Sequence, residues 1–200
     1  MKESLKTISR ETEEALAIYA SLLIKWNKKI NLIGKSTEEK IWERHINDAL
    51  QICSAIPQTS KNLLDIGSGA GIPGLIIAIA MPQLKVTLVE SDQKKCAFLV
   101  EARRVVGCKN VEILADRVES IEGTWDVITA RAVTKLKELL FWKSLVGHKN
   151  TVGLWLKGKE WREELEDAKT MFVFDSVITP SITETNSVLI TTKSSQLKAG

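Results

Sequence analysis

The chain has 200 residues, is 44% hydrophobic and carries a formal net charge of +3. This length can bury one sizeable core but excludes two full domains, and the charge is far below that of a strongly basic DNA-binding module. The first residues lack the apolar core of a signal peptide, and no apolar run approaches the roughly 20 residues of a membrane span, so we expect a cytoplasmic protein without a membrane partner.

Residues 1–56 are predicted to form a helical extension of a single domain. Apolar residues recur every three or four positions over residues 3–30, which is typical of one or two amphipathic helices. Ser36 followed by Glu39 matches a capping box, which predicts a second helix from Ser36 to Cys53. This second helix carries a group of polar side chains near one face: Arg44, His45 and Asp48.

Residues 57–200 are predicted to form an α/β core in which strands and helices alternate. The predicted strands are 62–67, 85–90, 111–114, 126–130, 152–157, 172–178 and 187–192. The predicted helices are 72–80, 92–106, 134–147 and 159–169. This alternation predicts right-handed crossovers and a mainly parallel seven-stranded sheet covered on both faces. The last two strands have no helix between them, which predicts an antiparallel hairpin at one edge.

A glycine-rich stretch, DIGSGAGIPG at residues 65–74, follows the first predicted strand. In parallel sheets ligands bind beyond the carboxyl ends of the strands, and glycine lets the backbone approach a ligand closely. Three glycines therefore become candidate ligand contacts: Gly67, Gly69 and Gly71. A dinucleotide fingerprint needs a further glycine where Ile72 stands, which weakens but does not remove the hypothesis of a nicotinamide-dependent oxidoreductase.

An acidic residue, Glu90, ends the second predicted strand about 20 residues after the glycine loop, the separation at which an acid accepts hydrogen bonds from ribose hydroxyls. Glycine amides before a helix suit a carboxylate, and Asp65 suits a positive centre. These features favour an adenosine ligand without a pyrophosphate, namely S-adenosylmethionine. The alternative is a glycine-rich turn beside a surface glutamate.

The loop after the fourth predicted strand, ITARAVTK, bears on the methyl acceptor. It lacks the Asn/Asp-Pro-Pro-aromatic pattern usual in amino-group methyltransferases, and none of the three cysteines has the proline neighbour expected of a carbon-5 pyrimidine nucleophile. The cysteine spacing also indicates neither a disulfide framework nor a metal site. A ring nitrogen such as guanine N7 needs only orientation and cationic or hydrogen-bonding support, for which Arg131 is the candidate. The alternative for Arg131 is a salt bridge to Asp65 or Glu90.

Six blocks of the sequence together resemble, in order and spacing, the bacterial ribosomal RNA small-subunit methyltransferase G family, the glucose-inhibited division protein B proteins. The blocks are WNKKINLIGKSTEEKIWERHINDAL, LLDIGSGAGIPGLIIAI, VTLVESDQKKCAFL, NVEILADRVE, VITARAV and LWLKG. The resemblance implies a Rossmann-like class I fold and S-adenosylmethionine as cofactor. It further implies methylation of N7 of a guanine in the 530 loop of 16S ribosomal RNA, presented as RNA or as the 30S subunit.

The resemblance also implies roles for individual residues at matching positions. Together with the loop and its partner acid, the expected cofactor-binding residues are Asp65, Gly67, Gly69, Gly71, Ile72, Glu90, Val118, Glu119 and Arg131. The expected catalytic residues toward the RNA cleft are Asn31, His45, Arg131 and Lys157, with Arg44 and Asp48 beside them.

Simpler interpretations stay open for several of these residues. His45 equally suits a satisfied core histidine, Lys157 suits a solvated lysine, and Trp26 and Trp42 are predicted to be core residues rather than base-stacking platforms. For the whole chain, a non-catalytic RNA-binding module is a further alternative. We expect a monomer without a bound metal.

Overall fold

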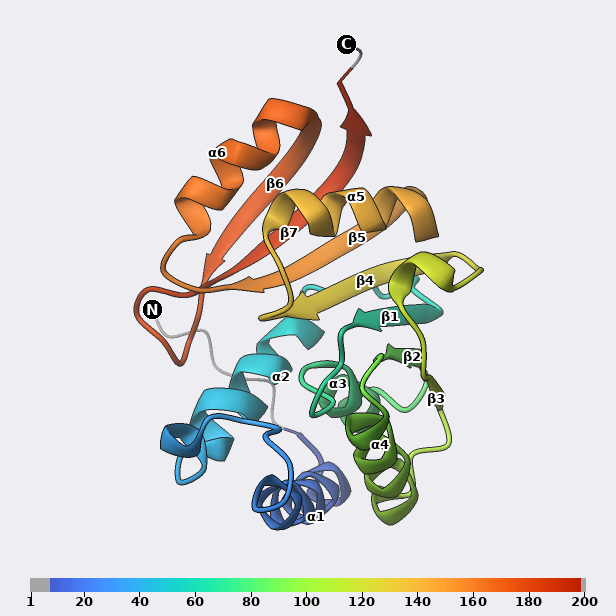
Figure 1. The fold of residues 1–200 in the computed structure, drawn as a ribbon, viewed down its shortest axis with the longest axis vertical. Helices are drawn as coiled ribbons and strands as arrows, with labels where there is room; N and C mark the ends of the chain where they lie inside the picture. The colour runs from blue at the N-terminus through green and yellow to red at the C-terminus, as the bar shows by residue number, and fades with distance from the viewer. Residues whose placement is uncertain (1–7, 199–200) are drawn as a thin grey trace.

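The computed structural model describes residues 8–198 and contains one seven-stranded sheet with helices on both faces (Figure 1). The strands are β1 (Asn62–Ile66), β2 (Lys85–Val89), β3 (Val111–Leu114), β4 (Trp125–Arg131), β5 (Gly147–Lys157), β6 (Phe172–Pro180) and β7 (Val188–Leu197). The sheet order is β3-β2-β1-β4-β5-β7-β6, with parallel pairing from β3 to β5 and antiparallel pairing of β7 with both β5 and β6. The predicted mainly parallel sheet and its edge hairpin are therefore confirmed.

The helical elements follow the predicted alternation within a few residues, apart from the segment before β1. They are α1 (Arg10–Asn27), the 3-10 turn η1 (Lys35–Thr37), the π-helix η2 (Trp42–Asn47), α2 (Asp48–Cys53), α3 (Gly74–Ala80), α4 (Gln93–Val106), the 3-10 turn η3 (Val118–Ser120), α5 (Leu136–Val146) and α6 (Trp161–Met171). The apolar pattern predicted from residue 3 begins outside the described residues.

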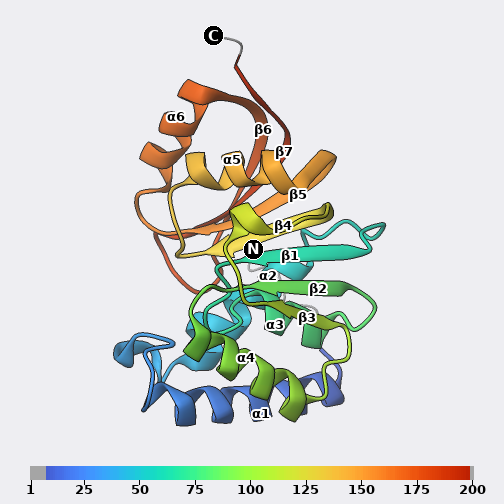
Figure 2. The same cartoon turned by 45° about the vertical axis from the view of Figure 1, so that its right-hand side comes forward.

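Two hydrophobic cores lie on the two faces of the sheet, because successive residues of a strand point to opposite sides. On β1, Leu63 packs into the core formed with α1 to α4, while Leu64 packs into the core formed with α5 and α6. Figures 1 and 2 both show α1 beside α4 at the end of the molecule opposite α6. The sheet order reverses between β1 and β4, so the carboxyl ends of these two strands form the switch point where α/β folds bind ligands.

The helix α1 is attached firmly to the core. The hydroxyl of Ser9 caps it by accepting a hydrogen bond from Thr12 N, and its apolar face buries Leu16 and Tyr19 completely. Trp26 packs against Phe98 of α4 with ring centroids 5.7 Å apart. Both Trp26 and Trp42 pack against the first core, in agreement with their prediction as core residues.

The single helix predicted over residues 36–53 is wrong. Its first part is a compact turn, because Asn27 at the end of α1 accepts hydrogen bonds from Leu32 N and Ile33 N and donates to the Glu38 carboxylate. Among the described residues Ser36 and Glu39 form no capping pair, and continuous helix begins only near Trp42, with a π-helical segment before α2. Arg44 and His45 lie on this π-helix, a rare element that is frequent at functional sites.

Candidate active site at the carboxyl ends of β1 and β4

The glycine loop after β1 contains three residues in the left-handed region, Gly67 (φ 64°), Gly69 (φ 54°) and Gly71 (φ 79°). A Cβ atom on Gly67 would lie 2.7 Å from Val133 Cγ2, and one on Gly71 would lie 2.8 Å from Leu75 Cβ. At Gly69 the nearest atom would be 3.8 Å away. A Cβ atom would therefore crowd Val133 or Leu75 at the first and third glycines, whereas Gly69 of these three leaves space above the loop.

Glu90 lies directly against this loop. Its Oε2 accepts a hydrogen bond from Gly69 N at 2.8 Å, and its Oε1 accepts one from Asp92 N at 2.8 Å. The structure thus brings together the loop and the acid that the sequence places about 20 residues apart. Asp92, which sequence analysis missed, also caps α4 by accepting from Lys94 N and Lys95 N. The signal for Asp92 was an aspartate immediately before a helical pattern.

Asp65 is fully buried beneath the glycine loop. Its Oδ2 accepts a hydrogen bond from Gly74 N at 3.1 Å, at the start of α3, while its Oδ1 has no partner within the described part of the chain. Burial raises the pKa of Asp65 to about 7, and the nearby Glu90 carboxylate acts in the same direction. A cation placed beside Oδ1 would relieve this penalty by stabilising the ionised form.

The other residues expected around the donor are engaged within the protein. Ile72 is only 8% exposed and packs in the first core, and Val118 is buried in the second core. Glu119 is exposed, and its Oε1 accepts a hydrogen bond from Trp142 Nε1 at 3.1 Å. The Val118 side chain therefore serves packing, so this loop would reach a ligand through its backbone or through Glu119.

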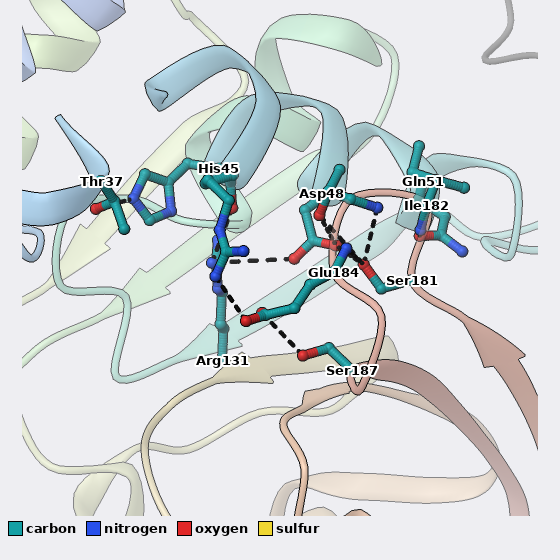
Figure 3. A network of polar contacts seen from close by, with 11 residues as sticks. Thr37, His45, Asp48, Gln51, Arg131, Ser181, Ile182, Glu184 and Ser187 are labelled. Carbon is teal, nitrogen blue, oxygen red and sulfur yellow. Dashed lines mark hydrogen bonds and ion pairs between the residues drawn. The ribbon is translucent and has the colours of Figure 1, made fainter. Parts of the chain in front are cut away.

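Arg131, the last residue of β4, contacts η2 and α2, and Figure 3 shows it near Asp48 and Glu184. Its Nη2 donates to Arg44 O at 3.0 Å and lies 3.9 Å from Asp48 Oδ2. The alternative of a salt bridge to Asp65 or Glu90 is therefore wrong, because the helical extension supplies the anion. Arg131 Nη1 is buried without a hydrogen-bond partner in residues 8–198, which leaves a donor available beside the site.

His45 is buried next to this pair. Its Nε2 lies 2.9 Å from Thr37 Oγ1, and its Nδ1 is buried without a partner among the residues that the structure describes. Burial lowers the pKa of His45 to about 4, and Arg131 and Arg44 lower it further through charge repulsion. The imidazole is therefore neutral at physiological pH and can hold η2 against the turn at Thr37 without carrying charge.

The loop between β6 and β7, residues 181–187, is fastened to α2. Asp48 Oδ1 accepts hydrogen bonds from the Ser181 hydroxyl at 2.8 Å and from the Thr183 hydroxyl at 3.2 Å. Gln51 completes the attachment by donating to Pro180 O and accepting from Ile182 N. Figure 3 shows Asp48 between Arg131 and this loop.

A second attachment of the same loop involves Glu184. Its Oε1 accepts a hydrogen bond from Arg44 Nη2 at 2.6 Å and its Oε2 accepts one from the Ser187 hydroxyl at 2.9 Å. Sequence analysis did not identify the loop, because more than 130 residues separate it from Asp48 along the chain and no local pattern reports such a contact.

A cavity of about 430 Å³ opens between this loop and the ends of β4 and β5. Its polar lining is Asp48, Arg131, Thr134, Lys157, Glu164, Glu184 and Ser187. Lys157 is 8% exposed, and its Nζ lies 2.6 Å from Glu164 Oε2 and donates to Thr134 O, so the interpretation as a solvated lysine is wrong. Val133 lines the cavity and also contacts Gly67, so the cavity and the glycine loop share a wall.

Ala132, between Arg131 and Val133, has φ 54°. This left-handed conformation is uncommon for alanine and costs of order 1 kcal/mol, and such residues cluster at functional sites. The strained turn at Ala132 lies where the glycine loop and the cavity meet.

Asn31 is not part of this cluster. It is exposed in a separate hollow of about 450 Å³ with Lys29, Asp92 and Lys95, next to the start of α4. A larger cavity, about 980 Å³, opens at the amino ends of the strands near Lys85, Asn110 and Trp125. It contains none of the predicted site residues, so chemistry and not size identifies the candidate site.

Known structures share this fold over most of the chain. A ribosomal protein L11 methylase from Lactobacillus delbrueckii has a TM-score of 0.60 at 12% identity, with 74% of this chain and 76% of that chain covered. A SAM-dependent methyltransferase from Aquifex aeolicus has a TM-score of 0.59 at 16% identity, with 86% and 96% covered. The chain therefore has the Rossmann-like fold of the class I S-adenosylmethionine-dependent methyltransferases.

The particular family follows from sequence. A family model described as rRNA small subunit methyltransferase G matches residues 12–191. Two proteins named Ribosomal RNA small subunit methyltransferase G are each 42% identical: that of Methylobacterium nodulans over 92% of this chain and 89% of its own, and that of Gluconobacter oxydans over 93% and 95%. The chain belongs to this family of methyltransferases. Its membership confirms the resemblance and removes the oxidoreductase alternative.

Within residues 8–198, no helix combines the length and apolar character that crossing a membrane would require. The same part of the chain contains no group of three or more His, Cys, Asp or Glu side chains that could hold a metal ion.

Proposed function

We propose that the protein transfers a methyl group from S-adenosylmethionine to N7 of a guanine in the 530 loop of 16S ribosomal RNA. The observation that carries this proposal is that Val133 separates two adjoining sites. The glycine loop, held by Glu90, lies on one side, and the cavity lined by Arg131 and Lys157 lies on the other. Methyl transfer needs a donor and an acceptor held in line and shielded from water, and two adjoining sites meet that need.

The residues at the glycine loop fit the donor. The Glu90 carboxylate accepts hydrogen bonds from two backbone amides. It has further lone pairs that can accept hydrogen bonds from ribose hydroxyls. Asp65 offers an unpartnered buried oxygen for a cationic group. We include Gly67, Gly69, Gly71, Ile72, Val118 and Glu119 in the proposed donor site. When bound, S-adenosylmethionine supplies a methyl group activated by its sulfonium centre.

On the acceptor side, the chain needs to orient a base rather than move a proton. The N7 lone pair is free at neutral pH, so no general base is required, and a neutral His45 fits a positioning role in holding η2. Arg131 and Lys157 would orient the acceptor nucleotide by donating hydrogen bonds to guanine O6 or to a flanking phosphate. Asn31, in the turn after α1 and in the hollow beside Asp92 and Lys95, is proposed to guide RNA.

The proposal also covers partners and location. The substrate would be 16S ribosomal RNA or the 30S subunit, and the reaction would take place in the cytoplasm. The protein would act as a monomer, with residues 1–56 as a helical extension and residues 57–200 as the Rossmann-like core. Because phosphate contacts release counterions, affinity for the RNA should fall steeply with salt.

The test combines labelled methyl donor with 16S RNA, or 30S subunits, from cells that lack this modification. We expect label at N7 of one guanine in the 530 loop. Arg131→Ala should reduce the rate by roughly 100-fold, as loss of a preorganised charge does, while Arg103→Ala, at an exposed position on α4, should leave the rate unchanged. Label on another base, or none, would refute the proposal.

A further inference from the structure

The cavity between β4, β5 and the 181–187 loop is lined by three carboxylates, of which two are committed to the protein. Asp48 accepts two hydroxyls and faces Arg131. Glu164 accepts Lys157 Nζ and Leu136 N, and its side chain is 16% exposed. The Asp48 and Glu164 side chains are only 9% and 16% exposed, so a ligand entering the cavity has little access to either carboxylate.

Glu184 differs because its side chain is 43% exposed although both of its oxygens are already oriented. Arg44 holds Oε1 and the Ser187 hydroxyl holds Oε2, so each oxygen retains capacity for a further donor. These same hydrogen bonds hold the pKa of Glu184 below its usual value, so the group is anionic at neutral pH. The loop itself is folded tightly, with Glu184 N donating to the Ser181 hydroxyl.

Glu184 lines the cavity from the 181–187 loop, whereas Val133 forms the wall that the cavity shares with the glycine loop. The 181–187 loop precedes β7, which pairs with β5, so it lies across β4 and β5 from the glycine loop on β1. A base in the cavity would turn one edge toward the glycine loop and the opposite edge toward Glu184. In guanine N7 lies on one edge, and N1–H and the N2 amino group lie on the opposite edge as two parallel donors.

We propose that Glu184 selects guanine by accepting hydrogen bonds from N1–H and the N2 amino group of the acceptor base. Among the four RNA bases only guanine presents these two donors side by side, and a carboxylate matches them with two oxygens. Adenine offers an acceptor at N1 and would be repelled. The inference rests on the proposed function and adds to it the residue that chooses the base.

The experiment compares guanine with inosine, which keeps N7, O6 and N1–H but lacks the N2 amino group. Semi-synthetic 16S RNA with either base at the target is assembled into 30S subunits, and kcat/KM for methylation is measured with wild type and Glu184→Gln. Wild type should prefer guanine by roughly 10 to 100-fold, the range of a lost hydrogen bond to a charged group. The preference of Glu184→Gln should shrink to about twofold or less.

The control variant is Thr183→Ala, which weakens the attachment of the same loop to Asp48 and leaves the Glu184 carboxylate in place. It should change the rates for both RNAs by the same factor. If Glu184→Gln also changes both by one factor, or if wild type does not discriminate, Glu184 is only an attachment point and the inference is overturned.

Two readouts separate this failure from failure of the proposed function. Wild type that labels no guanine N7 in unmodified subunits refutes the function, and the inference with it. Wild type that labels guanine while Glu184→Gln keeps the full preference refutes the inference alone. Binding of S-adenosylhomocysteine by Glu184→Gln should equal that of wild type, and loss of that binding would make Glu184 a folding residue and count against base selection.

Discussion

The substitution Gly67→Ala tests whether Val133 forms a wall shared by the glycine loop and the cavity. An L-residue at φ 64° costs about 1 to 2 kcal/mol, and the new Cβ would lie 2.7 Å from Val133 Cγ2, well inside the roughly 3.5 Å of a normal carbon contact. Val133 is 38% exposed, so it can swing outward rather than resist. We therefore expect a loss of about 1 to 2 kcal/mol, or roughly 2 to 8 °C in Tm, together with a displaced Val133.

Calorimetry with S-adenosylhomocysteine distinguishes the two effects. Gly107→Ala is the matched control, because Gly107 has φ 72° at the end of α4 and an added Cβ there would meet nothing within 4 Å, so it carries only the backbone cost. Gly67→Ala should bind the product at least about tenfold more weakly, whereas Gly107→Ala should bind it normally. Adding Val133→Ala to Gly67→Ala should recover much of the affinity. Equal binding by both single variants would refute the shared wall.

Three further results are expected. The pKa of Asp65 is raised to about 7, and the cationic amino group that the donor shares with its product would favour the ionised carboxylate. Product affinity, measured by calorimetry, should therefore rise as pH increases through 7 in wild type and stay flat in Asp65→Asn. The pKa of His45 in the folded protein lies below its unfolded value of 6.5, so its contribution to the free energy of unfolding is present above pH 6.5 and is lost as pH falls toward 4. Urea unfolding should show a loss of up to about 3 kcal/mol over this range, and His45→Gln should not show it. Lys157→Met leaves Glu164 without its cation and should lower the free energy of unfolding by about 3 kcal/mol in the same assay. Adding Glu164→Gln should restore most of this stability, whereas additive losses would contradict the ion pair.

The sheet was predictable because its information is local. Each buried strand is a short run of mostly apolar residues, such as Leu63, Leu64 and Ile66 of β1, and the alternation with helices leaves few topologies. The juxtaposition of Gly69 and Glu90 followed from the same rule, since the carboxyl ends of neighbouring parallel strands meet at one edge.

The partners of the site residues were not predictable from local pattern. Arg131 pairs with Asp48 because η2 and α2 cross the end of β4. The start of the helix expected from Ser36 is instead part of a turn, in which the Asn27 side chain holds Leu32, Ile33 and Glu38. Both outcomes depend on side chains that meet only after the chain has folded. Capping rules describe neighbours along the sequence and carry no information about such contacts.

The hydroxyl of Tyr19 donates a hydrogen bond to Ala70 O at 2.7 Å, so α1 holds the glycine loop directly. A chimera with a foreign N-terminal segment that lacks this tyrosine would therefore lose the hydrogen bond to Ala70 O, even if every residue of the glycine loop were kept. Swapping such segments between relatives to change RNA preference would need to keep a tyrosine at position 19, so that its hydroxyl still donates to Ala70 O.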